Sequence, residues 1–399
     1  MQIYMVGGAV RDALMGLPVK DQDWVVVGST PEELLALGYL PVGRDFPVFL
    51  HPQTKDEYAL ARTERKTAPG YRGFAIHAAP DVTLEQDLAR RDLTINSIAT
   101  QAYSTRANGT FDTSKTTLID PFGGQQDIAH KVLRHVTKAF REDPVRILRV
   151  ARFAARFADF LVAPETCQLM REMVRDGEVD HLVSERVWQE LARGLMEKRP
   201  SRFFEVLADC DALPRLFPEV RTLPEPLQTA ALDVAATKQA PLSVRFACLC
   251  VSLLPSSQPV GQGADKTSGL EDISERLRAT NECRELAEVV VREHEAIGKC
   301  GGFKAAALVD LLERCDAFRK PDRLADILLA CECLAYAGQP ATDKPYPQRK
   351  RLMRAQAAAK AVATDLIAAH AISTGAKGPK IGEMIHLARI AAVQRELGP

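Results

Sequence analysis

Two aspartates separated by one residue open an apolar run in the stretch VKDQDWVVVG. The run after them, Trp24 to Val27, has the bulky and β-branched character of a buried strand. Side chains two residues apart on a strand point the same way, with Cα atoms about 6.5 Å apart. Asp21 and Asp23 would therefore repel each other unless a cation lay between them. A hard divalent ion such as Mg²⁺ takes oxygen ligands and keeps positions for phosphates, so the pair indicates a catalytic metal site.

An isolated Asp-x-Asp pair is also compatible with the start of a strand that binds no ligand. The neighbouring residues therefore decide between the two interpretations. The preceding stretch YMVGGAVRDALMG predicts a strand, two glycines and the start of a helix. Glycines at a strand end let backbone N–H groups approach a phosphate, and a helix N-terminus favours an anion. This turn could therefore bind a phosphate, which Arg11 could hold through a bidentate guanidinium.

A second basic motif lies in residues 83–99, TLEQDLARRDLTINSIA, which we predict to be one helical stretch containing Arg90, Arg91, Asp92 and Asn96. An Asp at this point could accept a hydrogen bond from a ribose 2′-hydroxyl. The alternative is an ordinary ion pair within a helix.

A third motif, EDPVRILR, places Asp143 before a proline at a predicted helix start. Asp143 and Arg146 are three residues apart, so their side chains can reach the same ligand. Arg149, on the next turn, can reach it too. The alternative is a cationic helix face that also includes Arg152 and Arg156 and is solvated or faces RNA.

In combination and in this order, GGAVRD, KDQDW, RRDLTIN and EDPVRILR resemble the signature of the bacterial-type, class II polymerase-β-like nucleotidyltransferases. More closely, the chain resembles the CCA-adding tRNA nucleotidyltransferases, densely over residues 1–220 and again over residues 375–393. The resemblance implies an α+β fold: a polymerase-β-like N-terminal domain with a small mixed sheet and helices, followed by an all-α region. It also implies template-independent addition and repair of the tRNA 3′-terminal CCA from CTP and ATP, by two-metal nucleotidyl transfer with release of pyrophosphate.

By the same resemblance, Asp21 and Asp23 are the catalytic residues and the Mg²⁺ ligands. The residues expected to bind the nucleotide are Gly8, Arg11, Arg91, Asp143, Arg146 and Arg149. Glu64 is a candidate third carboxylate, with a solvated strand-end residue as the alternative.

The motif around Asp143 and Arg146 offers a way to choose cytosine and adenine without a template. Both bases carry an exocyclic amino donor beside an unprotonated ring nitrogen, whereas uracil and guanine present a carbonyl beside a ring N–H. An aspartate that accepts and an arginine that donates fit the first pair, while the second pair would leave buried groups unpaired.

The predicted organisation has three parts. Residues 1–138 form the catalytic domain, residues 139–225 a helical nucleotide-selection domain, and residues 226–399 a helical body and tail. We expect a surface hairpin near residues 101–124, a mobile loop at residues 65–74 and a linker at residues 253–269.

The composition, 46% hydrophobic and 26% charged, is that of a globular protein, and lysine plus arginine equal aspartate plus glutamate at 52 each. We expect a cytoplasmic protein without a membrane segment, a monomer or homodimer, with nine reduced and mostly buried cysteines. Any RNA-binding surface must be local, and residues 343–360 are a basic candidate for holding the tRNA acceptor and TΨC arms, with a solvated helix as the alternative.

Relatives of this kind often carry a histidine-aspartate phosphohydrolase domain in the helical region. This sequence contains no His-Asp dipeptide, and residues 182–293 contain no histidine. We expect a degenerate domain without cyclic phosphodiesterase or phosphatase activity. The alternative functions are a poly(A) polymerase, a partial enzyme that adds only C or only A, and a non-catalytic RNA-binding protein.

Overall fold

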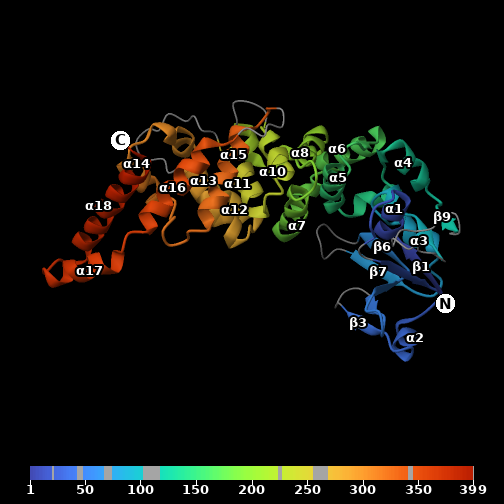
Figure 1. Ribbon diagram of the computed structural model, residues 1–399. Coiled ribbons are helices and arrows are strands. Elements are labelled where there is room, and N and C mark those ends of the chain that lie inside the picture. Colours follow the sequence, from blue (N-terminus) through green and yellow to red (C-terminus); the bar gives the residue numbers. More distant parts are fainter. Residues whose placement is uncertain are drawn as a thin grey trace. The chain divides into compact units, whose positions relative to one another are not determined.

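The computed structural model describes residues 1–19, 22–42, 48–66, 74–101, 117–222, 227–254, 268–339 and 345–398 (Figure 1). The chain divides into two compact units. The first consists of Met1–Gly194 and Arg202–Pro218, and the second of Leu195–Ser201 and Glu219–Pro399. The boundary expected at residue 225 lies close to this division, whereas the boundary expected at residue 138 falls inside the first unit. The division into three domains remains a prediction.

A mixed sheet forms the framework of the first unit. In spatial order its seven described strands are β3 (Leu40–Val42), β4 (Val48–Leu50), β5 (Glu57–Leu60), β2 (Asp23–Val27), β1 (Gln2–Val6), β8 (Ala99–Thr100) and β9 (Leu118–Ile119). The β2 and β5 strands are parallel, and all other neighbours are antiparallel. The predicted small mixed sheet is confirmed.

Two further strand pairs lie outside this sheet. The antiparallel pair of β6 (Arg62–Lys66) and β7 (Phe74–Ala78) flanks the expected mobile loop, of which residues 67–73 lie outside the described residues. The expected hairpin likewise falls largely on residues 102–116, which are also outside them. A short parallel pair joins β10 (Val132–Leu133) to β11 (Leu161–Val162).

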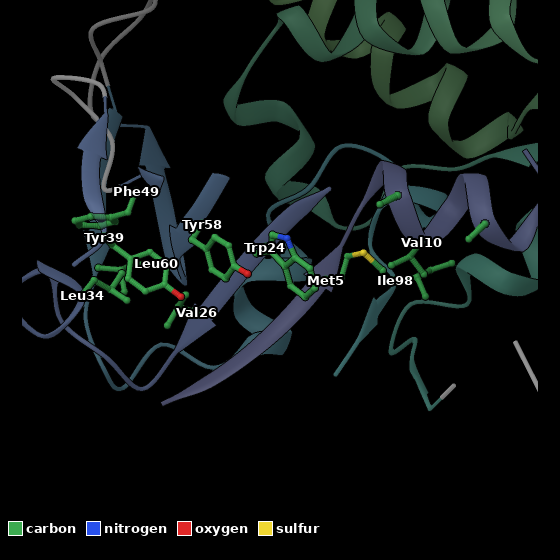
Figure 2. Close-up of a cluster of buried hydrophobic side chains, with 12 residues drawn as sticks. Met5, Val10, Trp24, Val26, Leu34, Tyr39, Phe49, Tyr58, Leu60 and Ile98 are labelled. Atoms are coloured by element: carbon green, nitrogen blue, oxygen red, sulfur yellow. The ribbon is translucent and has the colours of Figure 1, made fainter. Parts of the chain in front are cut away.

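Both faces of the large sheet are covered, because the apolar side chains on β1 and β2 point alternately to opposite sides. Met5, Trp24 and Val26 belong to one cluster, which is shown in Figure 2. In this cluster Trp24 stacks on Tyr58 of the neighbouring β5, with ring centroids 5.4 Å apart. The opposite face has its own cluster, and there the buried Val25 faces inward.

The helices of the first unit cover these faces and continue into an all-helical stretch. Near the sheet lie α1 (Gly8–Leu14), α2 (Pro31–Ala36), α3 (Leu84–Ala89) and α4 (Gly124–His130). The later helices are α5 (Val145–Arg156), α6 (Pro164–Arg175), α7 (Ser184–Leu195), α8 (Ser201–Asp209) and α9 (Leu213–Leu216). Helices α1 and α2 pack on the Trp24 face and α3 on the Val25 face.

The single helix expected across residues 83–99 is wrong. Helix α3 ends at Ala89, and a separate 3-10 turn, η1, spans Thr94–Asn96. Between them the Asp92 carboxylate accepts from the backbone N–H of Leu93 at 2.8 Å, and Leu93 is extended. A local side-chain bond of this kind competes with the helical hydrogen bond and stops the helix.

Helices are the only regular elements among the described residues of the second unit. Its helices are α10 (Ala230–Thr237), α11 (Leu242–Leu253), α12 (Ser268–Leu277), α13 (Asn281–Lys299), α14 (Ala305–Arg314), α15 (Arg323–Ala335), α16 (Pro347–Lys360), α17 (Thr364–Ser373) and α18 (Gly378–Leu397). The expected linker falls between α11 and α12, where residues 255–267 lie outside the described residues.

The cysteines behave as the sequence predicts. All nine are free thiols, and eight are buried. Burial raises the pKa of the Cys210 thiol to about 12, so this thiol stays protonated at neutral pH. In the described ranges, no helix combines the length and apolar character needed to cross a bilayer.

Candidate active site

The turn after β1 brings the Arg91 guanidinium and the Asp23 carboxylate close to Gly7. Gly7 has φ 72°, in the left-handed region that glycine tolerates best. A Cβ atom at Gly7 would lie 2.8 Å from Nη1 of Arg91 and 4.0 Å from Oδ2 of Asp23. The absence of a side chain at Gly7 therefore lets the Arg91 guanidinium and the Asp23 carboxylate approach the same turn.

The sheet register explains the position of Asp23. Asp23 is the first residue of β2 and pairs with Val6 on β1, the residue immediately before the glycine turn. On the other side it pairs in parallel with Glu57, and both carboxylates are exposed. Register partners in neighbouring strands point to the same face, so Glu57 is the carboxylate that the sheet aligns with Asp23.

The structure describes the two other predicted carboxylates, Asp21 and Glu64, only in part or not at all. Asp21 lies outside the described residues, and β2 begins at Asp23, so the predicted pair on one strand remains a prediction for Asp21. Glu64 lies on β6, in the separate two-stranded sheet, and its side chain is outside the described part. Sequence reasoning did not single out Glu57, because nothing local shows which strand pairs with β2.

Arg91 is oriented by the end of α3. Its Nη2 donates to the fully buried Asp87 at 3.2 Å, and its Nη1 donates to the Asn96 carbonyl at 3.5 Å. Burial opposes ionisation of Asp87, but the charges of Arg90 and Arg91 outweigh this effect and lower the pKa of its carboxyl group. An ionised, immobile Asp87 thus holds Arg91 against the glycine turn.

Asp92 connects this region to α5. Its Oδ2 accepts from Nε of Arg149 at 2.6 Å, and its Oδ1 accepts from Nδ2 of Asn96 at 3.0 Å. Although burial opposes it, the charge of Arg149 lowers the pKa of Asp92, and Asp92 in turn raises the pKa of Arg149. Both groups are therefore charged at neutral pH.

Asn96 is the centre of this network, a role that sequence reasoning did not assign. Its backbone carbonyl accepts from Arg91, its amide nitrogen donates to Asp92, and its amide oxygen accepts from Nη1 of Arg11. Asn96 thus links Arg11 to Asp92 through its side chain and binds Arg91 through its backbone carbonyl. Its place in the RRDLTIN motif was the available signal, but the partner on α1 is distant in sequence.

Arg11 is more deeply buried than we expected for a residue that binds a phosphate. It is 3% exposed, and its Nε and Nη2 both donate to Asp12 Oδ1, at 2.9 and 2.8 Å. Its guanidinium lies 5.2 Å from the Phe153 ring centroid and 5.3 Å from that of Phe157. Burial lowers the pKa of Arg11, and Asp12 opposes this change. Arg11 therefore ties α1 to α5, and its contact with a nucleotide remains a prediction.

The start of α5 presents the predicted base-reading residues. Asp143 precedes the helix, and its Oδ1 accepts from the Val145 backbone N–H at 3.0 Å. Pro144 occupies the N-cap position of α5, so Asp143 lies one residue earlier than expected, although its side chain still accepts from the first N–H of the helix. Arg146 is buried one turn further on and donates from Nη1 to the Ala139 carbonyl at 2.7 Å.

The expected alternative of a solvated cationic face does not hold for the last two arginines of α5. Arg152 donates from Nε to Glu190 at 2.6 Å, and Arg156 donates from Nη2 to Asp12 at 2.8 Å. Both arginines are therefore engaged in ion pairs inside the first unit.

The basic helix α16 is likewise engaged within the second unit. Arg349 pairs with Glu332 at 3.3 Å, Arg351 donates to the Phe303 carbonyl and Arg354 pairs with Glu396 at 2.8 Å. Counting basic residues in the sequence therefore overstates the free positive charge on this helix.

One further group of charged residues lies between α14 and α18. His386 is 3.5 Å from Asp310 through Nε2 and 3.1 Å from Glu313 through Nδ1, and Arg389 is 3.4 Å from Glu313. One ligand atom from each of Asp310, Glu313 and His386 lies within 4.8 Å of the others, a spacing that could hold a metal ion, although exposed acidic groups often gather without one. The cluster lies apart from the glycine turn and joins α14 to α18.

The residues beside the glycine turn fit a hard divalent cation. Asp23 offers an exposed carboxylate at a rigid strand end, with Glu57 aligned beside it and the Arg91 cation close by. Oxygen donors of this kind suit Mg²⁺, and the neighbouring arginine suits a phosphate. Together with the mixed sheet, this site defines a nucleotidyltransferase of the polymerase-β-like class.

Comparison with known proteins agrees with that class and narrows it. The poly(A) polymerase head domain family matches residues 3–134, and the family described as "Probable RNA and SrmB- binding site of polymerase A" matches residues 159–223. The multifunctional CCA protein of Polaromonas naphthalenivorans is 60% identical, covering 99% of this chain and 98% of its own length. That of Acidovorax sp. strain JS42 is also 60% identical, covering 98% and 96%. The chain belongs to the family of multifunctional CCA proteins.

Solved structures agree at the level of the fold. The Bacillus stearothermophilus CCA-adding enzyme in complex with CTP has a TM-score of 0.64 at 24% identity, covering 99% of this chain and 89% of that one. The Thermotoga maritima CCA-adding enzyme complexed with tRNA has a TM-score of 0.64 at 22% identity, covering 100% and 87%. The predicted polymerase-β-like domain followed by helices is confirmed.

Proposed function

We propose that this chain adds and repairs the 3′-terminal CCA of tRNA, using CTP and ATP and releasing pyrophosphate. The observation that carries the proposal is the connected network from Gly7 and Arg91 through Asn96 and Asp92 to Arg149. This network joins the glycine turn beside Asp23 to the helix that begins at Asp143. A nucleotide whose phosphates lie at the turn would have its base directed towards α5.

Each end of the network has a chemical role in the proposed reaction. When bound by Asp21 and Asp23, Mg²⁺ would activate the tRNA 3′-hydroxyl and neutralise charge on the triphosphate. Arg91 would hold the sugar or phosphates, because Asp87 and the Asn96 carbonyl already fix its guanidinium. Asp143 would accept from the exocyclic amino group of cytosine or adenine, and Arg146 would donate to the adjacent ring nitrogen.

Gly8, Arg11 and Arg149 complete the proposed nucleotide site in different ways. A Cβ atom at Gly8 would lie 3.4 Å from Nη2 of Arg11, so this turn packs closely over the guanidinium. Arg149 keeps its Nε on Asp92, which leaves its terminal nitrogens for a ligand. Arg11 acts through Asn96 and α5 more than by direct contact, given its burial.

The decisive experiment uses tRNA lacking its last three nucleotides, Mg²⁺ and each labelled nucleoside triphosphate in turn. Three additions in the order C, C, A support the proposal. A long A tail would instead support a poly(A) polymerase, and addition of only C or only A a partial enzyme. No incorporation would support a non-catalytic RNA-binding protein.

The proposal includes no phosphohydrolase activity, although the relatives are named multifunctional. Helix α11 lies in the segment where the metal-binding helix of such a domain is expected. Its residues there include Val251 and Ser252, which offer no imidazole to a metal. The Ser252 hydroxyl donates to the Cys248 carbonyl of its own helix at 3.1 Å. Location in the cytoplasm, tRNA contact by the second unit and the monomeric or homodimeric state also remain part of the proposal.

A further inference from the structure

Asp143 is held by an arginine from another helix. Arg186, on the first turn of α7, donates from Nη1 to Asp143 Oδ1 at 3.1 Å and from Nη2 to Asp143 Oδ2 at 2.8 Å. This is a bidentate fork, in which the planes of the guanidinium and the carboxylate are matched. The two residues are 43 positions apart. The fork therefore sets the orientation of the Asp143 carboxylate around its last torsion.

The hydrogen bonds leave Asp143 with a defined remaining capacity. A carboxylate oxygen has about two acceptor positions. Oδ1 accepts from Val145 N–H and from Arg186 Nη1, which uses both. Among the described residues, Oδ2 accepts from Arg186 Nη2 alone, so one position on Oδ2 remains for a further donor. The side chain is 18% exposed, which restricts the directions from which a donor can approach.

Helix α7 makes a second contact with α5 one turn further along. Glu190, four residues after Arg186 and therefore on the same helix face, accepts from Nε of Arg152 at 2.6 Å. Both pairs hold α7 against α5, but only Arg186 touches a residue proposed to read the base. Glu190 thus provides a matched control for loss of packing between the two helices.

We propose that Arg186 is a positioning residue for base selection, which rests on the proposed role of Asp143. By fixing the carboxylate plane, Arg186 directs the remaining position on Asp143 Oδ2 at the amino group of cytosine or adenine. A uracil or guanine would place a carbonyl oxygen against the same immobile carboxylate oxygen, and neither group can donate. A carboxylate free to rotate would bind the correct bases less well and would also reject the wrong bases less strongly.

The test measures kcat/KM for all four nucleoside triphosphates on tRNA lacking either CCA or the terminal A. Arg186→Lys keeps the positive charge but loses the planar two-donor fork. We expect the preference for CTP and ATP over UTP and GTP to fall by about tenfold to a hundredfold. The KM values of the correct nucleotides should rise more than their kcat values fall. Arg186→Gln, a neutral variant with an amide donor, should reduce the preference in the same direction.

A purely structural role for Arg186 predicts a different result. In that case kcat/KM would fall equally for all four nucleotides, and Glu190→Gln would behave like Arg186→Lys. We expect Glu190→Gln to lower thermal stability while leaving the preference unchanged. An unchanged preference in folded Arg186→Lys and Arg186→Gln would overturn the inference.

The Asp143→Ala variant separates this inference from the proposed function. If Asp143→Ala keeps full preference, the proposed reading role of Asp143 is wrong and the inference falls with it. If Asp143→Ala loses preference but the Arg186 variants retain it, only the inference is wrong. If Arg186 acts through Asp143, adding Arg186→Lys to Asp143→Ala should change the preference no further, because the two losses share one interaction.

Discussion

Arg149 on α5 donates from Nε to the buried carboxylate of Asp92 at 2.6 Å, across 57 residues of sequence. Asp92 follows α3, which covers the catalytic sheet, whereas Arg149 lies on the helix that begins beside Asp143. The pair therefore couples the position of the predicted base-reading helix to that of the glycine turn. This coupling makes its removal informative for both stability and nucleotide binding.

We expect Asp92→Asn to lower the free energy of unfolding by about 1–3 kcal/mol at pH 7, because Arg149, whose side chain is 35% exposed, loses its charged partner. The pKa of Asp92 is lowered in the folded protein, so its contribution is present above the unfolded value of about 3.9. That contribution is lost as the pH falls through the lower folded value. Urea unfolding should therefore show a constant difference from the parent between pH 7 and pH 5 that shrinks in more acidic solution.

The matched control for that measurement is Asp159→Asn, which breaks an exposed pair with Lys131. Exposed pairs contribute little, so this variant should resemble the parent protein at every pH. An Asp92→Asn protein as stable as the parent at pH 7 would contradict the assigned coupling.

Gly7→Ala should abolish nucleotide incorporation and destabilise the first unit. The new Cβ would lie 2.8 Å from Nη1 of Arg91 and would require a positive φ. The backbone conformation alone costs on the order of 1–3 kcal/mol for a residue other than glycine. Gly16→Ala is the control, because Gly16 also has positive φ, at 67°, but has no atom within 4 Å of an added Cβ. Loss of activity in both variants to the same degree would show that strain, and not the approach to Arg91, is responsible.

Asp23→Asn should reduce incorporation by more than about a hundredfold, because replacement of a metal ligand has a larger effect than changes in its surroundings. Asp21→Asn should behave in the same way if the two residues share the ion. Binding of tRNA, measured by filter retention or fluorescence anisotropy, should be retained in both, and chelation of Mg²⁺ should abolish activity of the parent protein.

Two controls accompany the Asp23 experiment. Asp81→Asn removes an exposed carboxylate of the same unit and should leave incorporation unchanged. Glu57→Gln tests the carboxylate that the sheet register aligns with Asp23, and it should raise the Mg²⁺ concentration needed for half-maximal activity. Full activity of Asp23→Asn at ordinary Mg²⁺ concentration would remove the basis of the proposed mechanism.

Arg146→Ala should blur the choice of C and A over U and G, because the ring nitrogen of the correct bases loses its donor. The expected change in the ratio of kcat/KM values is about tenfold or more. Arg141→Ala removes a nearby arginine whose partners are Glu172 and Asp176, and it should leave the ratio unchanged. Equal ratios for parent and Arg146→Ala proteins would show that the template assignment is wrong.

Hydrolysis of 2′,3′-cyclic AMP, measured with Mg²⁺, Mn²⁺, Ni²⁺ or Co²⁺, should not exceed the rate with metal alone. The reason is chemical: residues 182–293 supply no imidazole, the ligand that such a metal cluster needs. Metal-stimulated hydrolysis by the pure protein would contradict this prediction.

Much of the first unit could be predicted because its signals are local. The apolar runs that became β1 and β2 bury alternate residues on two faces, and the glycine turn and α1 follow in the predicted order. The helix expected across residues 83–99 failed for an equally local reason, since the bond from Leu93 N–H to Asp92 outweighs helical periodicity. The composition and the hydrophobic periodicity of a sequence do not show which of two competing hydrogen bonds forms at a given residue.

The sequence by itself determined the order of the chemical motifs, the family they resemble and the residues expected to hold metal and nucleotide. Tertiary structure decided which of those residues are partners: Asp23 aligned with Glu57, Arg11 buried against Phe153, and Arg186 joined to Asp143. The chemistry of each side chain is given by its residue type, and helices and strands follow from short-range sequence patterns. Contacts between residues tens of positions apart depend on how strands pair and helices pack, because only the folded chain brings them within hydrogen-bonding distance.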